Sequence, residues 1–274
     1  MLVFAILILS SVGIGLWVFQ TYPSQSQQRH AGLRAVLIDE LSGTIPDPSF
    51  INQTQVSLSK AGYTLDYVAP ADVTVEYFAS LPLKGYDLIL IRAHTTAWPA
   101  IITSEPYSSA HYQYEQLTDR VVAGGLDKVY FAITPGFVSH EMRGDFGGAI
   151  IVVMGCGGPS NLDLANSFLE RGATAYIGWD GLVSASHTDA ATEAIVGMIS
   201  QRDTARDAVN QASNSLGPDP IYNGQLTYYD HTIIQDQQVR EFLAGLTILL
   251  PLIALVVLGP VLVLVLPKLL TLRG

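Results

Sequence analysis

The central part of the chain alternates short apolar runs with amphipathic ones, and this alternation restricts the fold more than any other feature. The apolar runs have the length and composition of strands, and they cover residues 35–41, 64–69, 86–92, 128–133, 149–154 and 173–179. The amphipathic runs are expected to be helices, and they cover residues 50–61, 75–81, 159–170, 189–200 and 204–215. Strands and helices in this order form right-handed crossovers and a mainly parallel sheet with helices on both faces. An α/β domain is therefore predicted for residues 33–215.

Two apolar segments without charged residues lie on either side of this domain, at 1–20 and 242–267. About 20 apolar helical residues span a hydrocarbon core of about 30 Å, so both segments are predicted to be transmembrane helices. Pro251 and Pro260 are compatible with this, because membrane helices tolerate proline. A removed signal peptide is the alternative for the first segment, and the lack of basic residues before the apolar run argues against it. Residues 21–32 and 216–241 would then be tethers.

Basic residues near the two segments bear on orientation. Lys268 and Arg273 follow the second segment and favour a cytoplasmic C-terminus, which with two spans places the domain outside the cytoplasm. Arg29 and Arg34 beside the first segment, and Arg240 before the second, argue the other way. The sequence thus predicts an integral membrane protein in contact with the lipid bilayer, with an extracytoplasmic domain.

The charge balance of the chain excludes one class of partner. The formal net charge is −10, with 24 acidic residues against 14 basic ones. Nucleic-acid backbones attract clusters of lysine and arginine, and the sequence contains no such cluster. Nucleic acid is therefore not expected to be a partner.

Two of the predicted strands end in residues that can carry out acyl transfer. His94 follows the strand at 86–92, and Cys156 follows the strand at 149–154. Ligands bind beyond the carboxyl ends of parallel strands, so the thiol and the imidazole meet if these strands are neighbours. His94 would then accept the thiol proton or stabilise the thiolate. A structural role is the alternative for Cys156, because unpaired cysteines are often buried and behave as small apolar residues.

The residues around Cys156 support a reactive role. Cys156 is the single cysteine of the chain, so it cannot form an internal disulfide. Gly155 and Gly157 flank it and allow the backbone to turn sharply, so that a substrate carbonyl can approach closely. The Cys156 amide would then donate to the developing oxyanion.

These features together resemble the caspase-like cysteine peptidases, a superfamily that includes caspases, gingipains, clostripain, separase and the CHAT domains. The shared pattern is a hydrophobic strand ending in His94, a long irregular stretch, and a hydrophobic strand ending in Gly155-Cys156. The run CGGPSNLDLANSFLERGATAYIGW is similar to CHAT and gingipain domains, in which the nucleophile loop leads into a helix, a Gly-Ala turn and a strand ending near tryptophan. The segment 189–192 (DAAT) resembles the start of the next helix in CHAT domains. The resemblance covers residues 33–200.

The resemblance implies a caspase-like three-layer α/β sandwich and thiol-dependent cleavage of a peptide or protein substrate through an acyl-enzyme, without a cofactor. It places the backbone of Thr95, Gly155 and Gly157 around the oxyanion. Several relatives that cleave after arginine or lysine use an acidic residue in the substrate pocket, and Asp180 and Asp189 are the candidates here. Asp189 is also well placed as a helix N-cap, and either acid could simply lie in a loop or at a helix start.

The chain departs from the family pattern at two positions. The family usually has glycine directly after the histidine, where this chain has Thr95, and Met154 replaces the glutamine of the caspase signature. The first departure favours the alternative function, a catalytically degenerate domain that serves as a binding or scaffold subunit of a membrane complex. A flavodoxin-like binder of small molecules is a third hypothesis, but no glycine-rich phosphate loop follows the first strand.

The remaining polar residues have no assigned role. The four histidines that follow His94 in the chain lack the spacing of metal ligands, so no metal site is predicted; they are His111, His140, His187 and His231. Asp39 and Glu40 end the first strand and could line the same edge as His94, although a solvated loop is the favoured interpretation.

Overall fold

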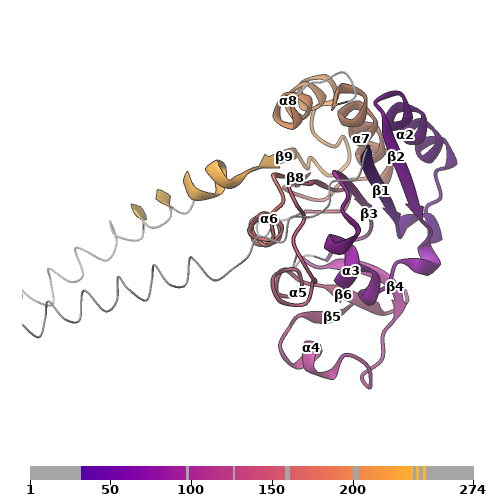
Figure 1. The fold of residues 1–274 in the computed structure, drawn as a ribbon, viewed down its shortest axis with the longest axis vertical. Coiled ribbons are helices and arrows are strands. Elements are labelled where there is room, and N and C mark those ends of the chain that lie inside the picture. The colour runs from indigo at the N-terminus through magenta and orange to yellow at the C-terminus, as the bar shows by residue number, and fades with distance from the viewer. Residues whose placement is uncertain are drawn as a thin grey trace, which may run out of the picture. The chain divides into compact units, whose positions relative to one another are not determined.

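A six-stranded, mostly parallel sheet forms the centre of the protein (Figure 1). The computed structural model describes residues 32–96, 99–125, 127–157, 161–199, 204–236, 239–240 and 243–244. The strand order is β2-β1-β3-β7-β8-β9; β9 runs antiparallel to β8, and the other neighbouring pairs are parallel. The strands are β1 (Leu33–Asp39), β2 (Tyr63–Val68), β3 (Leu88–Arg92), β7 (Ile150–Val153), β8 (Ala175–Trp179) and β9 (Leu226–Tyr229).

Helices cover both faces of this sheet, so the predicted α/β arrangement of three layers is present (Figure 1). One face carries α2 (Pro48–Lys60), α7 (Ala185–Ile199) and α8 (Ala205–Leu216). The other face carries α3 (Val75–Ser80), α5 (Pro135–His140) and α6 (Asn161–Glu170). Short 3-10 helices occur at Leu41–Gly43, Pro70–Asp72 and Leu81–Lys84.

Alternate residues of each central strand fill two separate cores. In β1, Val36 and Ile38 pack in the core beneath α3, α5 and α6, whereas Ala35 and Leu37 pack beneath α2, α7 and α8. This alternation follows from the period of two residues in a strand. All five residues of β3 are buried, as expected for a parallel strand covered on both faces.

A second, three-stranded antiparallel sheet is inserted between β3 and β7. Its order is β4-β6-β5, with β4 (Ile101–Pro106), β5 (Val121–Gly124) and β6 (Tyr130–Ile133), and α4 (Gln113–Leu117) precedes β5. Ile101, Val121 and Phe131 contribute to the core beneath α3, α5 and α6, and this packing attaches the small sheet to the domain. The described residues of the stretch between His94 and Cys156 thus include a folded insertion, although the sequence there is irregular.

Two element boundaries differ from the prediction. α7 begins at Ala185, so Asp189 lies inside the helix and does not cap it. Residues 226–229 form β9, although the segment 216–241 was expected to be a tether. The β9 strand pairs through Tyr229 with Tyr176 and through Leu226 with Trp179. The domain therefore extends beyond residue 215.

The predicted fold class and location are corrected with respect to the two transmembrane helices. Among the residues that the structure describes, no helix is long and apolar enough to cross a membrane, in contrast to the two predicted transmembrane helices and the predicted integral membrane protein. Residues 1–20 lie outside the described residues, and so does 242–267 apart from Leu243 and Ala244.

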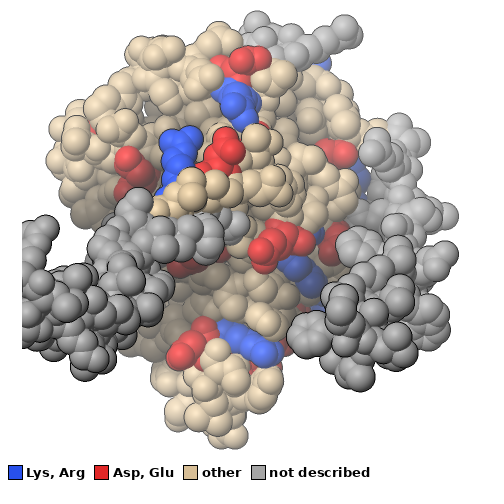
Figure 2. All heavy atoms as spheres, turned by 90° about the vertical axis from the view of Figure 1, so that its left-hand side faces the viewer, with Lys and Arg blue, Asp and Glu red and all other residues tan. Residues whose placement is uncertain are grey.

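Charged side chains of opposite sign adjoin one another on the face drawn in Figure 2. Exposed ion pairs among the described residues include Arg143 with Glu76 and Arg206 with Asp230. The charge of this face is therefore mixed rather than uniformly basic.

Candidate active site

The ends of β3 and β7 bring His94 and Cys156 to the same edge of the main sheet. The two strands are parallel neighbours, and their last pair is Ile91 with Val153. The same offset, continued three residues beyond this pair, places His94 opposite Cys156. A thiol–imidazole pair requires that the two strands be neighbours, and β3 and β7 are neighbours.

The loops that follow these two strands are in direct contact. The Thr95 hydroxyl donates a hydrogen bond to the Cys156 carbonyl oxygen. A Cβ added to Gly155 would lie 2.5 Å from the Ala93 carbonyl oxygen and 2.6 Å from Thr95 Cγ2. Real Cβ atoms do not approach other atoms so closely, so this contact between the loops requires glycine at position 155.

Gly157 fixes the other side of the cysteine loop against the end of β8. A Cβ at this position would lie 1.3 Å from the Trp179 carbonyl oxygen. The Gly157 amide donates to the Gly181 carbonyl at 2.8 Å. Cys156 is therefore held between the loop after β3 and the loop after β8.

The Cys156 thiol is half-buried and points toward the β8–α7 loop. Its sulfur donates to the Val183 carbonyl at 3.6 Å, and the side chain packs against an apolar cluster that includes Trp179 and Val183. In this conformation the thiol is bonded to Val183 rather than to the His94 imidazole. A thiol is a weak donor, so little free energy is needed to turn it away from this carbonyl.

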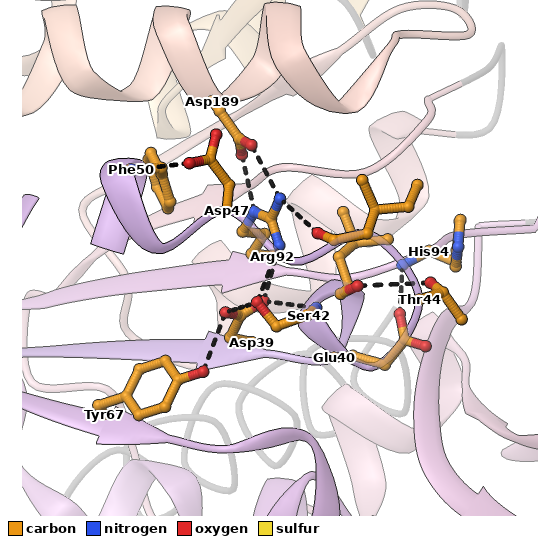
Figure 3. A network of polar contacts seen from close by, with 12 residues as sticks. Asp39, Glu40, Ser42, Thr44, Asp47, Phe50, Tyr67, Arg92, His94 and Asp189 are labelled. Carbon is orange, nitrogen blue, oxygen red and sulfur yellow. Dashed lines mark hydrogen bonds and ion pairs between the residues drawn. The ribbon is translucent and has the colours of Figure 1, made fainter. Parts of the chain in front are cut away.

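The backbone of His94 is held on both sides. Its N–H donates to Glu40 Oε2 at 2.8 Å, and its carbonyl accepts from the Ile102 amide at 2.8 Å. The ring is half-buried, and Figure 3 shows it on the side away from the Arg92 guanidinium. Burial lowers the pKa of His94 below its usual value, because the charged imidazolium is poorly solvated there. His94 is therefore neutral at neutral pH and can accept a proton.

Two backbone amides are candidates for binding an oxyanion. Thr95 N–H and Cys156 N–H donate no hydrogen bond to any residue that the structure describes. Since the donor is the main-chain amide, threonine can supply it as well as glycine can. Thr95 differs from glycine by the hydroxyl that holds the Cys156 carbonyl.

A buried ion-pair network lies at the same edge of the sheet, next to the loop of His94 (Figure 3). Arg92, the last residue of β3, is fully buried and binds Asp189 through two hydrogen bonds of 2.8 Å. It also donates to Asp39 at 2.9 Å and to the Ile45 carbonyl at 3.1 Å. Burial would lower the pKa of Arg92, but its bonds to Asp189 and Asp39 raise it above the usual value.

Asp39 and Glu40 are buried, so the solvated loop expected at the end of β1 is not formed. Asp39 accepts further hydrogen bonds from Ser42 and from the Tyr67 hydroxyl. Burial raises the pKa of the Glu40 carboxyl, and the hydrogen bond from His94 N–H opposes this rise. The sequence does carry a signal for this network. Asp39 and Glu40 stand at the end of one apolar strand and Arg92 at the end of another, and buried charges need partners.

The two acids expected in a substrate pocket differ in their surroundings. Asp189 is 4% exposed and both of its carboxylate oxygens bind Arg92, so it is not free for a substrate. Asp180 is exposed at the end of β8 and accepts a hydrogen bond from the Gln225 amide at 2.6 Å. Its backbone nitrogen would lie 3.3 Å from a Cβ at Gly157, so Asp180 is close to the cysteine loop.

The β8–α7 loop is tied to the α8–β9 loop by Asp219, which is buried. Its carboxylate accepts from the amide and hydroxyl of Ser184 and from the amides of Ile221 and Tyr222. Burial would raise the pKa of Asp219, but these hydrogen bonds outweigh it and hold the pKa below its usual range. The loop whose Val183 carbonyl accepts from the thiol is therefore attached to the α8–β9 loop through Asp219.

Comparisons add no family assignment: no model of a known protein family matches the sequence, and no curated protein is similar to it. Among the described residues, no group of three or more histidine, cysteine, aspartate or glutamate side chains could hold a metal ion. The geometry around Cys156 and His94 is therefore the basis on which a function can be assigned.

Proposed function

We propose that the protein is a caspase-like cysteine endopeptidase in which Cys156 is the nucleophile and His94 the general base. The observation that carries this proposal is the contact between the loops after β3 and β7, which brings the two residues together beyond neighbouring strands. Parallel α/β sheets bind their ligands at this edge. The resemblance seen in the sequence points to the same two residues.

In the proposed reaction the neutral His94 imidazole accepts the Cys156 proton, and the thiolate sulfur attacks the carbonyl carbon of the scissile peptide bond. The oxyanion that forms accepts hydrogen bonds from the amides of Thr95 and Cys156. The imidazolium then donates its proton to the leaving amine, which leaves a thioester. Water hydrolyses the thioester with His94 again accepting a proton, and the free thiol is restored.

Labelling with a thiol-reactive peptide tests this assignment. A peptidyl acyloxymethyl ketone should modify the purified full chain at Cys156, and Cys156→Ala should abolish the modification. His94→Ala should slow labelling by at least about 100-fold, since general-base assistance contributes that much or more. His111→Ala is the matched control, because this histidine is exposed and should leave the rate unchanged. Mass spectrometry of the labelled peptide measures each rate.

A non-catalytic binding domain is the second candidate function, and the hydrogen bond from the thiol to Val183 is the observation that favours it. On this hypothesis the thiol is structural, and Cys156 should react with probes only after unfolding. Equal labelling of the wild type and of His94→Ala would also support it.

Substrate preference is proposed to depend on Asp180, which is exposed beside the cysteine loop, so that a basic residue is accepted before the cleaved bond. A probe with arginine at that position should label the wild type about tenfold faster than one with glutamate, since a charge-assisted hydrogen bond contributes about 1.5–3 kcal/mol. Asp180→Asn should remove most of this difference and leave the rate with a neutral probe unchanged. An unchanged arginine preference in Asp180→Asn would exclude this role. Asp236→Asn, another exposed acid, is the control.

A further inference from the structure

Glu40 occupies the place where the hydrogen-bond ladder between β1 and β3 would otherwise continue. The two strands remain paired up to Asp39 and Arg92, after which a 3-10 helix starts at Leu41. His94 lies two residues beyond that last pair, where β1 no longer offers a backbone carbonyl. The Glu40 carboxylate accepts the His94 N–H in its place, at 2.8 Å (Figure 3).

The carboxylate side of this contact is buried. Glu40 is 6% exposed, and an unpaired carboxylate in such a site would be costly. The opposite side of His94 is also fixed, since its carbonyl accepts from the Ile102 amide of β4. The residue that carries the imidazole is therefore attached to the main sheet by Glu40 and to the small sheet by Ile102.

We propose that Glu40 is a positioning residue, which sets the place of the His94 imidazole relative to the Cys156 thiol by accepting the His94 backbone N–H. This inference rests on the proposed function and adds a residue to it. The role requires the reach of the side chain and an acceptor oxygen, and it does not require the negative charge. Three substitutions separate these properties.

Glu40→Gln keeps the length and an acceptor oxygen but removes the charge, and we expect its labelling rate to stay within about threefold of the wild type, a difference below 1 kcal/mol. Glu40→Asp keeps the charge but shortens the side chain by one methylene, and it should label at least about tenfold more slowly, since misplacement by about 1 Å can cost up to 100-fold. Glu40→Ala should be slowed at least as much as Glu40→Asp. Glu170→Ala, an exposed glutamate of α6, is the control and should match the wild type.

A measurement that does not depend on activity accompanies the rates. The chain has six histidines, so a sample labelled with [15N]histidine should give six backbone amide signals at most. The His94 signal is identified by its loss in His94→Gln. It should move in Glu40→Asp and Glu40→Ala and shift least in Glu40→Gln, while the other histidine signals stay in place. Preserved signals elsewhere show that a variant is folded.

The outcomes separate failure of this inference from failure of the proposed function. If the wild type is labelled and Glu40→Asp reacts at the wild-type rate, or Glu40→Gln is as slow as Glu40→Ala, the positioning role is wrong and the peptidase proposal stands. If the folded wild type is not labelled by any probe, the peptidase proposal fails and the positioning role fails with it. In that case a shift of the His94 amide signal in Glu40→Asp would report a purely structural contact.

Discussion

Arg92→Met should lower the free energy of unfolding by about 3–5 kcal/mol, because it removes one partner of a buried ion-pair network. Asp39 is fully buried and Asp189 is 4% exposed, so both carboxylates would be left without the cation that neutralises them. Because methionine fills much of the volume of the arginine side chain, the lost free energy of unfolding comes from the missing charge rather than from a cavity. Urea unfolding at neutral pH, followed by circular dichroism, measures it.

The control for this prediction is Arg143→Met, which removes an exposed ion pair with Glu76. Exposed pairs contribute up to about 1 kcal/mol, so the two arginine variants should differ clearly. Replacing Arg92, Asp39 and Asp189 together with apolar residues should recover much of the lost stability, because an apolar cluster of similar volume can substitute for a buried ion pair. Equal, small losses in both single variants would show that Arg92 is not enclosed as described.

Gly157→Ala should reduce the rate of Cys156 labelling by at least about 100-fold, because the cysteine loop must move to accommodate the new methyl group. The added Cβ would lie 1.3 Å from the Trp179 carbonyl oxygen and 2.4 Å from its carbonyl carbon. Both are backbone atoms of β8, which is buried and cannot give way easily. Residues 155–157 must therefore shift away from β8, and the thiol moves with them.

Gly197→Ala is the matched control. Position 197 lies in α7, and a Cβ there meets no atom within 4 Å. Alanine is the better residue in a helix, so this variant should be as stable as the wild type or more stable by about 0.5–1 kcal/mol, with an unchanged labelling rate. A wild-type rate in Gly157→Ala would mean that reactivity does not depend on the loop position seen in the structure.

The parts of the fold that depend on local patterns could be predicted from the sequence. Apolar runs such as the one before His94 are recognised by their composition, and strands separated by helices can form few arrangements other than a parallel sheet. In such a sheet His94 and Cys156 lie at the same edge once β3 and β7 are adjacent. That β3 and β7 are adjacent could be known only from the structure, because no local run of residues specifies the order of strands in a sheet.

The network around Arg92 could not be predicted in the same way. It joins residues from β1, β3 and α7 that are far apart in the sequence, and its members resemble ordinary solvated acids when each is read alone. Asp189 illustrates this: a cap or a pocket residue was expected, and the structure gives an ion pair with Arg92 inside a helix that starts four residues earlier. The short strand β9 was missed because four residues after a turn give a weak signal.

The two predicted transmembrane helices lie outside the residues that the structure describes, apart from Leu243 and Ala244. The length and composition of the two apolar segments alone led to that expectation, whereas no helix among the described parts of the chain could cross a membrane. Neither segment contains His94, Cys156 or any other residue that is assigned a role in the proposed reaction.

Strands β1, β3, β7, β8 and β9 lie side by side in the order in which the ribosome makes them. Each new strand therefore finds the edge of its neighbour already synthesised, so the sheet can grow outward as the chain emerges. His94 and Cys156 come to lie at the same edge of the sheet once β7 has joined β3. The loop beside the thiol is fixed only after Asp219 has been added and has bound Ser184. A growing chain thus contains His94 and Cys156 well before the loop beside the thiol is fixed, and the segment just before the last strand supplies the residue that fixes it.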